Sequence, residues 1–302
     1  MKKKKDGRWA IQSLAALATN SHLIGFFGEK INIYKGSLKS ACVPGLNCYS
    51  CPGAIGSCPV GSLQAVIAGR KHNFSFYVLG TLALFGMLLG RAICGFLCLF
   101  GFIQDLLYKI PTPKIKVPQR VDKCLRYLKY LVLAVLVVLL PIVLTNNFGM
   151  GAPTFCKWLC PAGTLEGGVP LIASDEGLRS RIGFLFYWKA AVLALVLLAS
   201  VLIQRPFCKY LCPLGAFYGF FSKAGLWRMR LDEAQCTGCG LCEKKCPMGV
   251  AVRQDINVPE CIRCGACKKA CPTGAIRTTY GFRDQAPAPS QPDLPRMKGT
   301  TT

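Results

Sequence analysis

The chain has 302 residues with a mean hydropathy of +0.37, and 52% of them are hydrophobic, which is too apolar for an ordinary soluble protein and indicates membrane spans. Its formal charge of +23 would also suit a nucleic-acid-binding protein. The basic residues lie beside apolar stretches, however, where the preference of Lys and Arg for the cytoplasmic side of a membrane explains them. We therefore expect membrane lipid, and no nucleic acid, as a partner.

Four stretches are apolar enough to cross a bilayer, at about residues 9–28, 74–90, 130–145 and 184–203. Each is near the length needed for a hydrocarbon core of about 30 Å. A signal peptide is the alternative for the first stretch, because a basic run precedes it. The sequence predicts an all-α, multi-pass domain of the cytoplasmic membrane over residues 1–225, with a cytoplasmic N-terminus.

Two pairs of motifs predict a two-fold internal repeat in this domain. Residues 91–101 (RAICGFLCLFG) resemble residues 205–215 (RPFCKYLCPLG), and both motifs follow an apolar stretch that ends in the cytoplasm. Residues 58–64 (CPVGSLQ) resemble residues 160–166 (CPAGTLE), and both precede an apolar stretch on the outer side. Units related by pseudo-symmetry would bring the matching motifs together at an axis.

The cysteines of these motifs predict two metal sites. Cysteines four apart share one helix face, and a Cys just before a helix lies where backbone N–H groups stabilise a thiolate. We expect an inner site from Cys94, Cys98, Cys208 and Cys212. We expect an outer site from Cys51, Cys58, Cys156 and Cys160, with Cys48 and Cys42 as alternatives to Cys51. These sites would hold one or two further iron–sulfur clusters, and buried structural cysteines or outer disulfides are the alternative.

Residues 226–282 contain two runs of the form C-x2-C-x2-C-x3-C-P, the ligand pattern of a bacterial [4Fe–4S] ferredoxin. In that pattern the fourth cysteine of each run binds the other cluster. One cluster would have as ligands Cys236, Cys239, Cys242 and Cys271, and the other Cys261, Cys264, Cys267 and Cys246. Zinc ribbons are disfavoured because they use separated C-x2-C pairs. The segment resembles the two-cluster bacterial ferredoxins, which implies a small α+β domain, and residues 283–302 are predicted to be a disordered tail.

Apolar spans with C-x3-C-P motifs before such a segment resemble the NapH type of membrane ferredoxin and the C-terminal part of NosR-like proteins. The resemblance implies electron transfer between a quinone pool or cytoplasmic donor or acceptor protein and an extracytoplasmic redox partner. The departures of this chain from the family suit a flavin or haem protein as that partner. This chain departs from the family in its outer cysteines and in Leu99, which stands where Pro is expected. No nucleophile or base is evident, so we expect an electron carrier without catalytic residues, whose C-terminal domain lies in the cytoplasm.

Three alternatives remain, of which the redox-sensing regulator is permitted by the NosR-like resemblance. A thiol–disulfide relay would use the same cysteine pairs without iron in the membrane. A redox-sensing regulator would keep a cluster that oxidants remove, without electron flow. A bis-histidine haem at His22 and His72 is the disfavoured alternative, because polar side chains at a membrane interface are much commoner.

Overall fold

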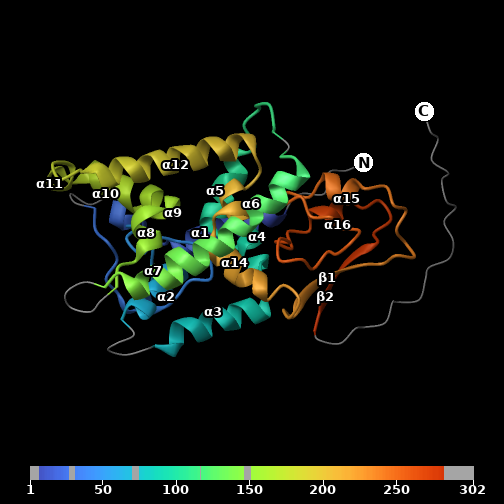
Figure 1. Cartoon of the computed structure of the whole chain (residues 1–302), viewed down its shortest axis with the longest axis horizontal. Coiled ribbons are helices and arrows are strands. Elements are labelled where there is room, and N and C mark those ends of the chain that lie inside the picture. The colour runs from blue at the N-terminus through green and yellow to red at the C-terminus, as the bar shows by residue number, and fades with distance from the viewer. Residues whose placement is uncertain (1–6, 27–30, 70–74, 116, 146–150, 282–302) are drawn as a thin grey trace.

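Figure 1 shows the computed structural model, which describes residues 7–26, 31–69, 75–115, 117–145 and 151–281. The N-terminal basic run, His72 and the predicted tail at 283–302 lie outside these residues. The described chain consists of a helical part up to residue 226 and a smaller C-terminal part from residue 227.

The helical part contains, in chain order, α1 (Gly7–Thr19), η1 (Leu23–Phe26), η2 (Ser37–Ser40), α2 (Pro59–Ala68), α3 (Phe76–Leu88), α4 (Ala92–Phe96), α5 (Leu99–Leu107), α6 (Gln119–Val132), η3 (Leu133–Leu139), α7 (Leu140–Val143), α8 (Thr154–Trp158), α9 (Pro161–Gly163), η4 (Thr164–Gly168), α10 (Val169–Ser174), α11 (Glu176–Arg179), α12 (Phe184–Leu202), α13 (Pro206–Tyr210) and α14 (Pro213–Phe220).

Two helices of the described chain are long and apolar enough to cross a membrane. Helices α6, η3 and α7 form one continuous helix of 25 residues from Gln119 to Val143, and α12 has 19 residues. The middle of the first is a π-helix that runs up to Leu139, two residues before Pro141. Proline has no N–H for an α-helical bond, and the wider π turns accommodate that loss within the helix.

The other two expected spans are shorter helices. Helices α1 and α3 have 13 residues each, about 20 Å, which is less than a hydrocarbon core. Helix α1 ends early because the Thr19 hydroxyl donates to Ala15 O and the Asn20 amide donates to Ala16 O, and these bonds satisfy the last carbonyls. Helix α3 ends before Gly90, whose φ of +53° terminates an α-helix. The four-span arrangement therefore stays a prediction.

The C-terminal part contains β1 (Trp227–Leu231), α15 (Leu241–Lys244), α16 (Ala266–Ala270) and β2 (Ile276–Tyr280). Its two strands pair antiparallel, with Trp227 opposite Tyr280 and Leu231 opposite Ile276. This pairing joins the two ends of the segment and encloses the two cysteine runs between them.

The C-terminal part lies at one end of the long axis of the molecule, and α10 and α11 lie at the other (Figure 1). Buried side chains form one continuous core through both parts. The interface is fixed by charged groups: Arg91 donates to Pro259 O, Lys129 pairs with Glu260 at 3.1 Å, and the Arg263 guanidinium donates to Leu89 O. These contacts hold the second cysteine run against the helices.

Candidate metal sites

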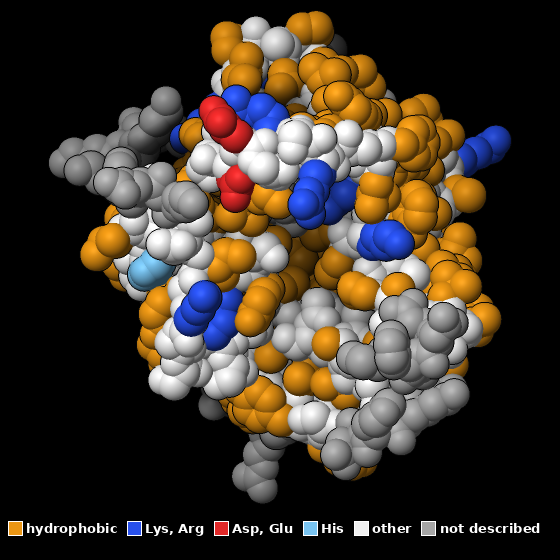
Figure 2. Space-filling view, turned by 90° about the vertical axis from the view of Figure 1, so that its left-hand side faces the viewer, with side chains coloured by type: hydrophobic (Ala, Val, Ile, Leu, Met, Phe, Trp, Pro, Cys, Tyr) orange, Lys and Arg blue, Asp and Glu red, His pale blue; other side chains and the backbone are white. Residues whose placement is uncertain are grey.

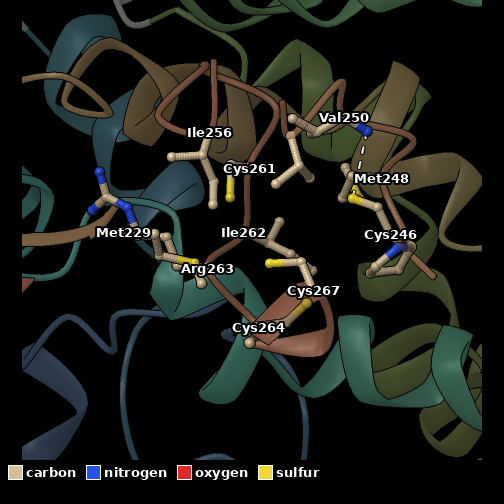
Figure 3. A pocket seen from close by; sticks show the side chains of 13 residues that line it. Met229, Cys246, Met248, Val250, Ile256, Cys261, Ile262, Arg263, Cys264 and Cys267 are labelled. Carbon is tan, nitrogen blue, oxygen red and sulfur yellow. Dashed lines mark hydrogen bonds between the residues drawn. The ribbon is translucent and has the colours of Figure 1, made fainter. Parts of the chain in front are cut away.

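The C-terminal part gathers its eight cysteines into two groups of four. One pocket is lined by Cys246, Cys261, Cys264 and Cys267, and Figure 3 shows their side chains around it together with Met229, Met248 and Ile262. The second pocket is lined by Cys236, Cys239, Cys242 and Cys271. In each group the fourth cysteine comes from the other run, as the ligand pattern predicts.

Glycines shape the loops that carry these thiols. Gly240 and Gly265 have φ of +69° and +74° and stand directly before α15 and α16. Residues other than glycine adopt these values only with strain, so the backbone can turn into each short helix at this point. Each helix then carries the third thiol of its run, Cys242 or Cys267, into the pocket.

In the pocket of Figure 3, the thiols of Cys261 and Cys267 are protonated near neutral pH unless a cation joins them. Burial, with the neighbouring thiols of Cys261 and Cys264, raises the pKa of Cys267 to about 12. Burial also raises the pKa of Cys261 to about 11. Four thiolates in so small an apolar space would repel one another, and iron supplies the positive charge that removes this penalty. The donor set therefore fits a cubane cluster.

The inner group of thiols forms between α4, α5, α13 and α14. The thiol of Cys212 lies within electrostatic range of Cys208, Cys94 and Cys98, so the structure brings together the four predicted cysteines. All four side chains are buried. Cys98 and Cys212 stand immediately before α5 and α14, and the Gly215 N–H donates to the Cys212 sulfur at 3.4 Å.

Two buried arginines link the halves of the inner group. Arg205 donates to the carbonyl of Cys94 at 2.6 Å, and Arg91 donates to the carbonyl of Cys208 at 3.2 Å. Each arginine thus contacts the cysteine segment of the other motif, in a reciprocal pattern. Arg205 also forms a buried ion pair with Asp105, at 2.6 Å from Nη2 to Oδ2. Two buried guanidinium groups beside four thiols provide positive charge for a cluster that is net negative.

The outer group forms between α2, α8, α9 and the loop before α2. The thiol of Cys160 lies within electrostatic range of Cys156, Cys58 and Cys48. Cys48 therefore occupies the place for which Cys51 was the first choice from sequence. The Cys51 thiol faces the Asn20 side chain at 3.7 Å, and Cys42 pairs through its backbone with Ser57.

A glutamine completes each of these two groups, and sequence reasoning missed both. The Gln104 amide donates to the Cys208 sulfur at 3.1 Å and its oxygen accepts the Phe207 N–H. The Gln64 amide donates to the Cys156 sulfur at 3.4 Å and its oxygen accepts from Phe155. Each glutamine stands six residues after a cysteine, Cys98 or Cys58, and that shared spacing is the signal that would have found them.

Within the residues that the structure describes, no three His, Cys, Asp or Glu side chains gather as they would around one metal ion. All nineteen cysteines lie in the described ranges, and all are free. Cys124 is exposed on α6 and belongs to no group.

Comparison with known families agrees with these groups. Residues 228–272 match the 4Fe-4S dicluster domain, and the 4Fe-4S binding domain matches residues 74–118, 130–169 and 185–231. Each of those three segments contains one apolar helix followed by one C-x3-C pair. The helical part thus holds three such units, where the sequence motifs had indicated a two-fold repeat.

The chain is similar to several known proteins over more than half of its length. It is 32% identical to an uncharacterized protein of Methanocaldococcus jannaschii, over 66% of this chain and 76% of that protein. It is 27% identical to the putative electron transport protein YccM of Escherichia coli, over 68% of this chain and 57% of that one. It is 29% identical to the regulatory protein NosR of Pseudomonas aeruginosa, over 56% of this chain but 22% of that one. No solved structure matches the chain.

Proposed function

Because the chain belongs to the ferredoxin-type 4Fe–4S proteins of the NapH and NosR type, we propose that it conducts electrons across the cytoplasmic membrane through four iron–sulfur clusters. Two clusters would be held by the C-terminal part, one by the inner group and one by the outer group. The ligands of the two membrane clusters would be Cys94, Cys98, Cys208 and Cys212, and Cys48, Cys58, Cys156 and Cys160.

The observation that carries this proposal is that a cysteine loop of the C-terminal part lies directly against the helix that contributes Cys94 to the inner group. A methyl group on Gly95 of α4 would lie 2.6 Å from the Ile262 carbonyl and 3.8 Å from Cys264 Cα. The cysteine loop of the C-terminal part therefore rests on the helix that carries Cys94. The Arg205 guanidinium lies within electrostatic range of both Cys264 and Cys208, so one charged group influences both sites.

Bound clusters supply one-electron carriers, and the chain supplies their surroundings. The inner thiols are buried and exclude water, which keeps the dielectric constant low around a transferred electron. The Gln104 and Gln64 amides and the N–H groups of Gly163 and Gly215 donate to sulfur. Such bonds stabilise the more negative, reduced state and set the reduction potential.

The two long apolar helices and the distribution of charge support an orientation in which the C-terminal part faces the cytoplasm and the outer group faces the other side of the membrane. The stretch 109–129 carries seven Lys or Arg against one Asp, and its Arg126 and Lys129 contact Met248 O and Glu260 of the C-terminal part, so this end would lie in the cytoplasm. The outer group lies toward the opposite end. There Cys48 and Cys156 are only half-buried, which leaves the site within reach of a docked protein.

Figure 2 looks onto the end of the molecule that is farthest from the C-terminal part. Hydrophobic side chains border a central hollow on this face, several Lys and Arg side chains lie near it, and Asp and Glu side chains lie above it. A flavin or haem protein with an acidic docking surface would suit such a face. The cytoplasmic donor or acceptor would bind at the other end, where Cys239 is exposed.

Proteoliposomes test the proposal directly. Ferricyanide is trapped inside vesicles that contain the reconstituted protein, dithionite is added outside, and the ferricyanide absorbance is followed. The wild-type protein should bleach the trapped ferricyanide, and Cys208→Ser and Cys156→Ser should each abolish this because each breaks one site. Cys124→Ser serves as the matched control and should conduct like wild type. Equal bleaching by all four proteins would refute the proposal.

A redox-sensing regulator is the second candidate, favoured by the similarity to a regulatory protein. It would need a cluster that oxidants remove reversibly, and no conduction. A protein that holds iron in the helical part but never bleaches trapped ferricyanide would support this alternative.

A further inference from the structure

Four side chains between α6 and α13 form a polar cluster, here called the α6 clamp: Asp122, Arg126, Lys209 and Tyr210. Asp122 is 7% exposed and lies at its centre. Its Oδ1 accepts the Tyr210 hydroxyl at 2.6 Å and pairs with the Lys209 ammonium. Its Oδ2 pairs with the Arg126 guanidinium, one helical turn later on α6. Two cations and a hydroxyl thus satisfy one buried carboxylate, and such a network is rigid.

The α6 clamp holds the segment that follows one of the inner cysteines. Lys209 and Tyr210 come directly after Cys208 on α13, and both are buried. Because both side chains bind Asp122, the backbone next to Cys208 is anchored to α6. The place of the Cys208 thiol therefore depends on a helix that contributes no thiol to the inner group.

The same cluster reaches the C-terminal part through Arg126. Its Nη2 atom donates to Met248 O at 2.9 Å and to Gly249 O at 3.0 Å. These carbonyls stand two and three residues after Cys246, whose thiol lines the pocket in Figure 3. The Val250 N–H closes this turn by donating to the Cys246 sulfur at 3.4 Å. The α6 clamp thus joins a cysteine segment of the inner group to a cysteine segment of the C-terminal part.

Arg91 makes a second connection between the same two groups. Its guanidinium donates to Cys208 O at 3.2 Å and to Pro259 O at 2.5 Å, two residues before Cys261. Its side chain is fully buried. Both connections lead from Cys208 to the cysteine group of Figure 3. In the other group of the C-terminal part, by contrast, Cys239 is exposed.

We propose that the α6 clamp sets the distance over which an electron passes between the inner site and the cluster held by Cys246, Cys261, Cys264 and Cys267. The cluster that includes Cys239 would then be the terminal carrier at the cytoplasmic surface. In each transfer one cluster is oxidised and the other is reduced by one electron, and no bond or proton changes place. Asp122 and Arg126 are positioning residues, which act through the backbone beside Cys208 and Cys246. This inference rests on the proposed function, since it needs a carrier at the inner site.

Arg126→Gln tests the α6 clamp, and Arg253→Gln is its matched control. Arg253 likewise pairs with a carboxylate, that of Glu243, and donates to a carbonyl in a cysteine run, Gly238 O at 3.1 Å. That run lines the other C-terminal pocket. The anaerobically purified proteins are compared with wild type by iron content and by the magnetic interaction between clusters in EPR. Rapid-freeze EPR after mixing with dithionite measures how long the inner cluster takes to be reduced once the C-terminal clusters are reduced.

We expect full iron in both variants. Only Arg126→Gln should show severalfold slower reduction of the inner cluster and a weaker magnetic interaction between that cluster and its C-terminal neighbour. The reason is that electron tunnelling and spin coupling both fall steeply with distance. Wild-type rates and magnetic interaction in iron-replete Arg126→Gln, or equal slowing in Arg253→Gln, would overturn the role of the α6 clamp and leave the proposed function intact.

Tyr210→Phe keeps the proposal testable if Arg126→Gln does not retain its iron. It removes one hydroxyl donor to Asp122, while the ring and both ion pairs of that carboxylate remain. Slower reduction of the inner cluster and a weaker magnetic interaction with full iron would support the α6 clamp, and wild-type values would overturn it. Wild-type protein without iron in the helical part would overturn both this inference and the proposed function.

Discussion

The inner and outer thiol groups share their local parts and differ in their surroundings. In both groups a Phe-Cys segment is held by a glutamine that accepts a backbone N–H and donates to sulfur. The inner group takes its fourth thiol from a second C-x3-C pair and lies between two buried arginines. The outer group takes Cys48 from a loop and lies beside Glu166, a buried carboxylate with one oxygen that no described group satisfies.

This contrast indicates that the shared spacing of cysteine and glutamine in the motifs produces the same local structure in both groups. The charged residues around each group determine the electrostatic potential at its thiols. Buried guanidinium groups stabilise an added electron at the inner site, whereas the Glu166 carboxyl group, whose pKa burial raises to about 8, brings no positive charge to the outer site. With similar sulfur ligation, the inner site should therefore have the higher reduction potential. Two clusters, each held by four thiols in a different electrostatic environment, would have different reduction potentials and could be distinguished in a redox titration.

The largest expected effect separates Cys48 from Cys51, three residues apart in one loop. Cys48→Ser should remove the iron of the outer site, about four irons per chain, because one ligand of a cubane is lost. Cys51→Ser should keep the full iron content, since its thiol faces Asn20 instead. Iron and acid-labile sulfide assays on the two proteins decide this. Full iron in Cys48→Ser together with a loss of about four irons in Cys51→Ser would show that Cys51, and not Cys48, is the ligand.

A smaller effect concerns the arginines that distinguish the inner site. Arg205→Met should lower the free energy of unfolding, but by less than the about 3–5 kcal/mol of an unpaired buried charge, because the Asp105 carboxylate loses Arg205 and keeps Arg8 as a partner. The inner cluster should become labile while the outer cluster persists. Adding Asp105→Leu should recover part of the loss, as measured by thermal unfolding in detergent. An unchanged unfolding temperature for Arg205→Met would contradict this role.

The smallest effect concerns the two glutamines. Gln104→Leu should lower the reduction potential of the inner site alone, because it removes an N–H donor to the Cys208 sulfur. Gln64→Leu should lower that of the outer site alone. Each lost bond is worth about 1 kcal/mol. EPR-monitored redox titrations measure both shifts, and each variant is the control for the other. A shift of both signals by either variant would show that the sites are misassigned.

The structure groups the cysteines as sequence reasoning did where they lie in local runs or in matching pairs. The ferredoxin cysteines form local runs whose spacing fixes their partners, and the inner group follows from two matching C-x3-C pairs. The choice of Cys48 over Cys51 could not be made this way. It depends on Glu166, which is 118 residues away and accepts the Cys48 N–H.

The spans show the same limit of sequence reasoning. Hydropathy located the apolar stretches, but the end of α1 is set by the side chains of Thr19 and Asn20, which bond to the last turn. The pairing of Arg91 and Arg205 across the two motifs also depends on three-dimensional packing. The repeated motif indicated that the two arginines were related, but not that each would contact the cysteine segment of the other.

The iron content of the anaerobically purified wild-type protein, measured together with its EPR spectrum, tests the central claim most directly. Four cubane clusters require about sixteen irons per chain. We expect this stoichiometry, with signals from the helical part that disappear in Cys208→Ser or Cys156→Ser. A protein with about eight irons, whose spectrum neither variant alters, would confine the clusters to the C-terminal part and contradict the account.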